Sequence, residues 1–145
     1  MVSYSTSIQI GAAVPTVWRA WTDSENITEW LAPKANVDFR PEGAYEFFWG
    51  DDPEKDSILG CVLLEIQPEG LLRFQWQGPT AFLPMFLPPD GRRTVIEVTF
   101  QARQGGTDVT LTQAETRDHR DWPAYEEWMS KAWGLAMTRL KECCE

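Results

Sequence analysis

Residues 13–33 constrain the fold more than any other segment, because they predict two short helices crowded with large aromatic rings. Pro15 suits the first turn of a helix, where the backbone N–H lacks a helical acceptor. Asp23 or Ser24 can cap the second helix, and Pro33 ends it. Helices this short are unstable in isolation. They need a larger surface, supplied by strands, against which to bury three indoles, those of Trp18, Trp21 and Trp30.

Length and composition indicate one domain over residues 1–145. The 145 residues are 43% hydrophobic and 24% charged, and the net charge is −9, which suits one ordinary domain. Nucleic acids and anionic membrane surfaces require clustered Lys and Arg, and only Arg92 and Arg93 are adjacent, so we expect neither as a partner. The first residues lack the features of a signal peptide and no apolar run reaches spanning length, so we expect a cytoplasmic protein.

Alternating polar and apolar residues predict seven strands. The first precedes the two helices, and short turns between the later ones favour antiparallel pairing. A twisted sheet of this size curls. The strands are expected at residues 3–10, 35–40, 45–49, 57–67, 72–77, 94–103 and 108–115.

A long C-terminal helix is expected from Asp121, its cap, to about Glu142, with Pro123 in the first turn. At 1.5 Å per residue it is about 30 Å long, enough to cross a whole sheet. The predicted fold is therefore α+β, a curled antiparallel sheet of about seven strands around this helix, with two short helices after the first strand. The helix is expected to bury one apolar stripe, made of Tyr125, Trp128, Ala132, Leu135, Ala136 and Leu140.

The register of the fourth strand leaves two orientations for Glu65. If Val62, Leu64 and Ile66 point inward, Glu65 points outward, which we favour. A shift by one residue would turn its carboxylate inward, into any cavity enclosed by the curled sheet, where it would be a candidate acid or base.

Residues 78–93 form a 16-residue connection that is rich in proline yet apolar. Long ordered loops often serve as lids or binding loops. Three destinations remain open for the apolar side chains: the cavity mouth, a second subunit, or an edge of the core. These side chains are Phe82, Leu83, Met85, Phe86 and Leu87.

The sequence predicts no catalytic residue, no metal site and no cofactor. His119 is the only histidine and lies in a polar stretch, where we expect a surface side chain. Cys61, Cys143 and Cys144 lack the spacing of a zinc site and are expected to be free thiols. The acidic loop at residues 51–56 lacks the pattern of an EF-hand and is expected to be solvated.

Motifs in a fixed order along nearly the whole chain resemble a known family, the bacterial homologues of the heat-shock protein 90 ATPase activator, in the START-related (SRPBCC) helix-grip superfamily. Gln113 departs from the pattern, because the family often has His there. So do Glu42, Leu71 and Gln75. The matching segments are residues 17–23, 30–33, 43–47, 65–68, 72–76 and 105–112, with Gly60, Trp133 and Leu140.

This resemblance implies the helix-grip fold, and it implies a homodimer because family members are often dimeric. The expected function is non-catalytic binding of a small hydrophobic or aromatic ligand between the sheet and the C-terminal helix, since the superfamily hosts such roles and eight tryptophans exceed what a small core needs. One alternative is a protein-interaction module of the co-chaperone or stress-response type, with a protein partner. Another is a cavity enzyme such as a cyclase or hydrolase. The expected lining residues are Trp30, Phe47, Trp49, Val62, Leu64, Trp76, Phe82, Phe86, Trp128 and Ala132.

Overall fold

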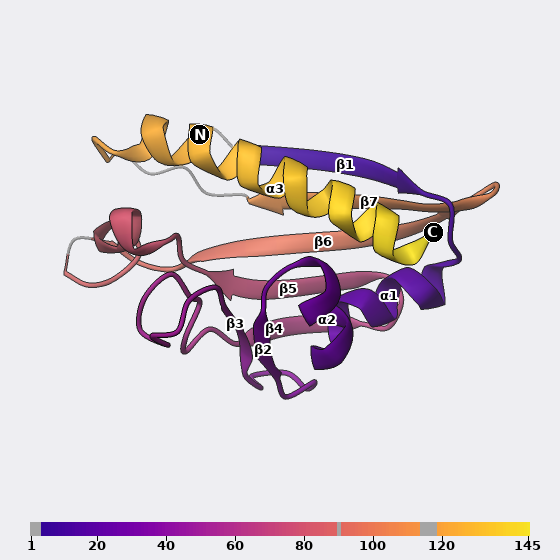
Figure 1. Cartoon of the computed structure of the whole chain (residues 1–145), viewed down its shortest axis with the longest axis horizontal. Coiled ribbons are helices and arrows are strands. Elements are labelled where there is room, and N and C mark those ends of the chain that lie inside the picture. The colour runs from indigo at the N-terminus through magenta and orange to yellow at the C-terminus, as the bar shows by residue number, and fades with distance from the viewer. Residues whose placement is uncertain (1–3, 90, 114–118) are drawn as a thin grey trace.

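An antiparallel sheet of five strands carries the fold, in the spatial order β1-β7-β6-β5-β4 (Figure 1). The computed structural model describes residues 4–89, 91–113 and 119–145. Inward-facing side chains of the central strands are fully buried and form one wall of the core. The strands are β1 (Tyr4–Ile10), β4 (Leu63–Gln67), β5 (Leu71–Trp76), β6 (Thr94–Arg103) and β7 (Gly106–Gln113).

Two further strands, β2 (Lys34–Val37) and β3 (Tyr45–Phe48), pair with each other as a separate ribbon. Isolated bridges, Ala44 to Val62 and Phe48 to Ser57, connect this ribbon to the segment before β4. The α+β expectation is confirmed. The expected strand over residues 57–67 is shorter in the structure, because its first half makes only these bridges.

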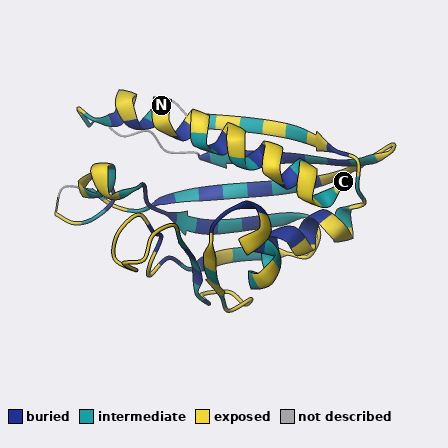
Figure 2. Cartoon of the chain, in the orientation of Figure 1, coloured by how far each residue is buried: buried dark blue, intermediate teal, exposed yellow. Residues whose placement is uncertain are grey.

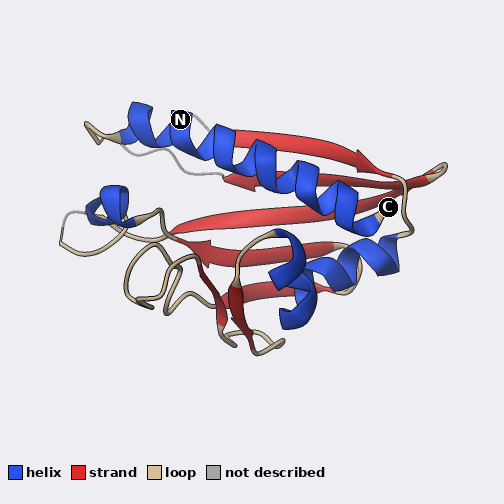
Figure 3. Ribbon diagram, in the orientation of Figure 1, coloured by secondary structure: helices blue, strands red, loops and turns tan. Residues whose placement is uncertain are grey.

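The helices α1 (Val14–Thr22) and α2 (Ser24–Trp30) cover one end of the sheet (Figure 3). Asp23 caps α2, its carboxylate accepting a hydrogen bond from the Glu25 N–H at 3.0 Å. The Trp30 indole donates to the Ala20 carbonyl oxygen at 2.8 Å. The three indoles of this segment are all buried, as expected.

The long helix α3 (Trp122–Cys144) lies across one face of the sheet, and its buried stripe differs from the expected one (Figure 2). Trp128 is 37% exposed and Leu135 is 55% exposed, whereas Trp133 is only 2% exposed. The buried and exposed apolar residues form two neighbouring stripes, both at helical spacing, so periodicity alone could not choose between them. The buried stripe consists of Trp122, Tyr125, Met129, Trp133, Met137 and Leu140.

The start of α3 also differs from the expectation, because the Asp121 side chain makes no capping hydrogen bond. Instead Nδ1 of His119 accepts a hydrogen bond from the Asp121 N–H at 3.0 Å. The histidine, not the aspartate, supplies the side-chain acceptor at this turn.

A β-bulge between Leu63 and Glu65 decides the orientation of the fourth strand. Leu63 is buried, whereas Leu64 is exposed and Val62 is half-buried, so the expectation that Val62 and Leu64 point inward was wrong. Glu65 points outward, as favoured, and its Oε1 lies 2.6 Å from Nη1 of Arg73. The extra residue of the bulge explains why strict alternation failed at this point.

The apolar connection packs on its own chain. It contains the 3₁₀ turn η1 (Thr80–Met85), and both Met85 and Phe86 are buried. The rings of Phe82 and Phe86 contact Tyr125 of α3, with centroids 5.4 and 5.0 Å away. Its buried side chains therefore cover the core beside the first turns of α3.

No helix within the three described ranges is long and apolar enough to cross a membrane.

Candidate functional site: an aromatic pocket beside the long helix

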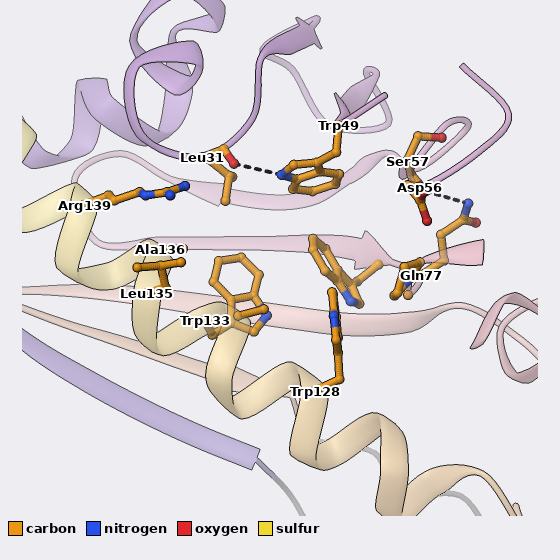
Figure 4. A pocket seen from close by; sticks show the side chains of 14 residues that line it. Leu31, Trp49, Asp56, Ser57, Gln77, Trp128, Trp133, Leu135, Ala136 and Arg139 are labelled. Carbon is orange, nitrogen blue, oxygen red and sulfur yellow. Dashed lines mark hydrogen bonds between the residues drawn. The ribbon is translucent and has the colours of Figure 1, made fainter. Parts of the chain in front are cut away.

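A pocket of about 410 Å³ lies between α3, the end of β5 and the loops that follow α2 and β3 (Figure 4). We call it the aromatic pocket, because four indoles contribute to its wall. It is lined by Leu31, Trp49, Asp56, Ser57, Trp76, Gln77, Gly78, Pro79, Trp128, Ala132, Trp133, Leu135, Ala136 and Arg139.

Hydrogen bonds fix the orientation of two of these indoles. Trp49 donates through Nε1 to the Leu31 carbonyl oxygen at 2.9 Å. Trp76 donates through Nε1 to the Tyr125 hydroxyl at 2.9 Å. Because each ring is held by its polar atom, its apolar surface stays in a fixed position beside the pocket.

The indoles divide into an inner wall and a rim. Trp76 and Trp133 are buried, and their ring centroids lie 5.1 Å apart. Trp49 and Trp128 are each 37% exposed and come from opposite sides of the pocket. The pocket therefore opens to solvent between two aromatic side chains.

One end of the aromatic pocket carries uncharged and acidic polar groups that the protein itself engages. Gln77 donates through Nε2 to the Ser57 carbonyl oxygen at 3.0 Å and accepts from Nε of Arg93 at 3.0 Å. The Thr80 N–H donates to the Asp56 carboxylate at 3.0 Å. These bonds join the loop after β3 to the start of η1 and fix this end of the pocket.

The opposite side carries a cation. In Figure 4 the Arg139 side chain extends from α3 toward Leu31, away from Asp56 and Gln77. The pocket thus combines an apolar middle with polar groups of different charge at its two ends.

The structure brings some of the expected lining residues together and separates others. Trp49, Trp76, Trp128 and Ala132 line the aromatic pocket. Phe82 lies just outside it, with its ring centroid 6.3 Å from that of Trp128.

The remaining expected lining residues lie elsewhere. Trp30, Phe47 and Phe86 are buried in the core and are not part of the pocket wall. Val62 is half-buried and Leu64 exposed, both near the bulge of β4. Phe47 satisfies the strand alternation that suggested it, but the rings of Trp30, Phe47 and Phe86 all pack against other core rings.

Sequence reasoning missed several lining residues. Trp133 is absent from the expected apolar stripe of the C-terminal helix, and nothing in the sequence distinguishes Arg139 from the other cations of that helix. Gly78 and Pro79 come within three residues of the end of β5, so their position beside the pocket could have been inferred from Trp76.

The Cys61 thiol and the hydroxyl of Ser57, which lines the pocket, are not activated as nucleophiles. Cys61 is buried, and burial raises the pKa of its thiol to about 12, so it is a poor nucleophile at neutral pH. The Ser57 hydroxyl donates to the Pro53 carbonyl oxygen at 2.6 Å. Within the part of the chain that the structure describes, no group of three or more His, Cys, Asp or Glu side chains could hold a metal ion. The geometry of the pocket is suited to enclosing an apolar molecule.

Comparison with known proteins connects this architecture to one family. Residues 12–145 match the model of the family described as "Activator of Hsp90 ATPase homolog 1-like protein". No curated protein matches the sequence.

Solved structures share the fold at low sequence identity. A protein from Mesorhizobium loti superposes with a TM-score of 0.78 at 21% identity, covering 98% of this chain and 96% of that one. A protein from Nitrosomonas europaea gives 0.75 at 22% identity, covering 98% and 93%. The Aha1 dimer from Colwellia psychrerythraea, a solution structure, gives 0.77 at 16% identity, covering 100% and 97%. On the match over residues 12–145, the chain belongs to the family of activator of Hsp90 ATPase homolog 1-like proteins.

Proposed function

We propose that the protein binds a small hydrophobic or aromatic molecule in the aromatic pocket without transforming it. The observation that carries this proposal is the set of four indoles, Trp49, Trp76, Trp128 and Trp133, around one opening of about 410 Å³. This volume falls in the range of small-molecule sites, roughly 300–1,000 Å³, which are mostly apolar with a few placed polar groups.

Burial of apolar surface would supply most of the affinity. An aromatic ligand that loses about 200 Å² of apolar surface gains roughly 5 kcal/mol at about 25 cal/mol per Å². The costs of association reduce this gain, so we expect dissociation constants in the micromolar range or weaker for simple ligands. The hydrogen bonds that hold Trp49 and Trp76 reduce the cost of ordering these side chains on binding.

The polar groups of the pocket favour binding over catalysis. The Ser57 hydroxyl is engaged by a backbone carbonyl and the Asp56 carboxylate by a backbone N–H. Neither is paired with a side-chain base or acid in the way an activated nucleophile requires. A cavity enzyme, such as a cyclase or hydrolase, would need its substrate to supply the reacting groups.

A filled pocket tests the proposal. In Ala132→Phe a ring is added to the wall of the pocket. In the matched control Ser130→Phe the same ring is added at an exposed position of α3, outside the pocket. Titration with neutral 1-naphthylacetamide is measured by calorimetry. It should show binding to the wild type and to Ser130→Phe, and at least tenfold weaker binding to Ala132→Phe. A wild type that does not bind it, or three equal affinities, would contradict the proposal.

An exposed apolar rim favours a second candidate, a protein-interaction module whose partner is a second copy of the chain. Leu135 is 55% exposed, and it lines the pocket from the same helix as the partly exposed Trp128. The relative from Colwellia psychrerythraea is described as a dimer, and a two-fold contact would bury the same rim on both copies.

Sedimentation separates this second candidate from a monomer. The wild type should sediment as a dimer and Leu135→Glu as a folded monomer. Ser130→Glu, at an exposed position about 140° away from Leu135 around α3, should remain a dimer. A monomeric wild type would rule out self-association as the role of this rim.

A further inference from the structure

Arg139 is the basic side chain that lines the aromatic pocket, and the described residues leave its charge without a partner. The other lining residues are apolar, uncharged or, in the case of Asp56, acidic. Asp56 accepts a hydrogen bond from the Thr80 N–H, and Figure 4 places it on the far side of the pocket from Arg139. The two charges are therefore separated by the apolar middle of the pocket.

The other basic residues of α3 are paired along the helix. Lys131 Nζ lies 3.3 Å from the Glu127 carboxylate, and Lys141 pairs with Glu145, both at a spacing of four residues. At that spacing Arg139 has Leu135 on one side and Cys143 on the other, neither of which carries a carboxylate. Glu142, three residues on, forms no ion pair with Arg139 in the described chain. Within the described ranges, Arg139 forms no ion pair or side-chain hydrogen bond. Its guanidinium is therefore available to donate hydrogen bonds to an anion.

From this arrangement we propose that the ligand of the aromatic pocket is an amphipathic anion, an aromatic or other apolar body that carries a carboxylate, and that Arg139 binds the carboxylate. The inference rests on the proposed function, because it assigns a ligand class to the same pocket. The planar guanidinium can donate two parallel hydrogen bonds to a carboxylate, which gives orientation as well as affinity. The aromatic body then lies among the four indoles, where offset or edge-to-face contacts are available.

The net charge of −9 shapes this recognition. At physiological ionic strength, charges more than about 8 Å from the pocket are largely screened. The attraction therefore depends on the short-range contact with Arg139, and the acidic remainder of the surface disfavours anions elsewhere. An anion is selected only when its apolar body positions the carboxylate at this side chain.

Two nearly isosteric probes test the inference: 1-naphthylacetate, which carries a carboxylate, and the neutral 1-naphthylacetamide. Arg139→Gln removes the charge and keeps an uncharged side chain with a polar end group. Arg19→Gln removes the same charge from an exposed position of α1 outside the aromatic pocket, where the described residues likewise form no ion pair with it. The two variants have the same net charge, so a long-range effect would change both equally.

We expect the wild type and Arg19→Gln to bind the acetate at least fivefold more tightly than the amide. In Arg139→Gln the affinity for the acetate should fall about tenfold, the size expected for charge-assisted hydrogen bonds at a partly exposed site, while the affinity for the amide stays the same. If the amide binds but the acetate shows no preference, or if Arg139→Gln weakens both probes equally, the anion inference fails and the proposed function stands. If neither probe binds to the wild type, both fail.

Discussion

Trp128 and Trp133 lie five residues apart on α3 and have different roles. Trp133 is 2% exposed and packs against both Trp21 and Trp76, with ring centroids 6.3 and 5.1 Å away. Trp128 is 37% exposed and lies at the mouth of the pocket, where it contacts Phe82. We therefore assign Trp133 mainly to stability and Trp128 mainly to the rim of the aromatic pocket.

Truncation of each ring separates these roles. Trp133→Ala should lower the free energy of unfolding by roughly 3–5 kcal/mol, since it leaves a large cavity in the core. Trp128→Ala should lower it by roughly 1–2 kcal/mol, because the ring is already partly hydrated. Urea unfolding followed by circular dichroism measures both values, and a larger loss for Trp128→Ala would mean that α3 packs on its other stripe.

The buried thiol of Cys61 makes stability depend on pH in the alkaline range. Burial raises its pKa from 9.0 to about 12, so the folded state holds the thiol proton more tightly than the unfolded chain does. The resulting contribution to stability is complete below pH 9 and is lost as pH rises from 9 to about 12. Urea unfolding at pH 8, 10 and 11 should show a shallower loss in Cys61→Ala than in the wild type, and parallel losses would exclude a role for this thiol.

At the scale of elements, the connection between β5 and β6 is anchored in the core by two buried side chains, those of Met85 and Phe86. Phe86 is fully buried against Tyr125, whereas Phe82 is only half-buried. Gly78 lies where this connection begins, and a Cβ added there would come within 2.8 Å of the Tyr125 ring and 2.9 Å of the Phe86 ring. The close approach of the connection to α3 therefore depends on these few residues.

Alanine variants of the two phenylalanines test this assignment. Phe86→Ala should lower the free energy of unfolding by roughly 3–5 kcal/mol. Phe82→Ala should cost less, roughly 1–2 kcal/mol, and should weaken the binding of 1-naphthylacetamide by loosening Trp128 at the rim. Thermal melting and calorimetry report the two effects. Equal stability of Phe86→Ala and the wild type would show that the connection is only a surface cover.

Local sequence signals predicted the elements well where one interaction decides the structure. The Asp23 cap, the short helices and the alternation of Tyr45 and Phe47 depend on neighbours in sequence. The bulge at Leu64 and the buried stripe of α3 depend on how distant segments meet. The sequence predicted Trp49 and Trp76 at the pocket because strand alternation is local, but the position of Arg139 depends on the rotation of a helix with two apolar stripes.

At the scale of the whole molecule, the aromatic pocket lies where three parts of the fold meet. The five-stranded sheet supplies Trp76, the segment after the β2–β3 ribbon supplies Trp49, and α3 supplies Trp128 and Trp133. Because these indoles come from segments distant in sequence, the pocket exists only in the folded chain. A ligand that binds there stabilises the fold, by an amount that grows with its concentration over its dissociation constant.

The most direct test observes all eight indoles at once. In a protein labelled with ¹⁵N at the tryptophan side chains, each Nε1–H gives its own resonance. Titration with 1-naphthylacetamide should shift the resonances of Trp49, Trp76, Trp128 and Trp133 and leave unchanged those of the indoles outside the pocket, Trp18, Trp21, Trp30 and Trp122. Shifts confined to the second group, or no shift at saturating probe, would contradict a binding site between the sheet and α3.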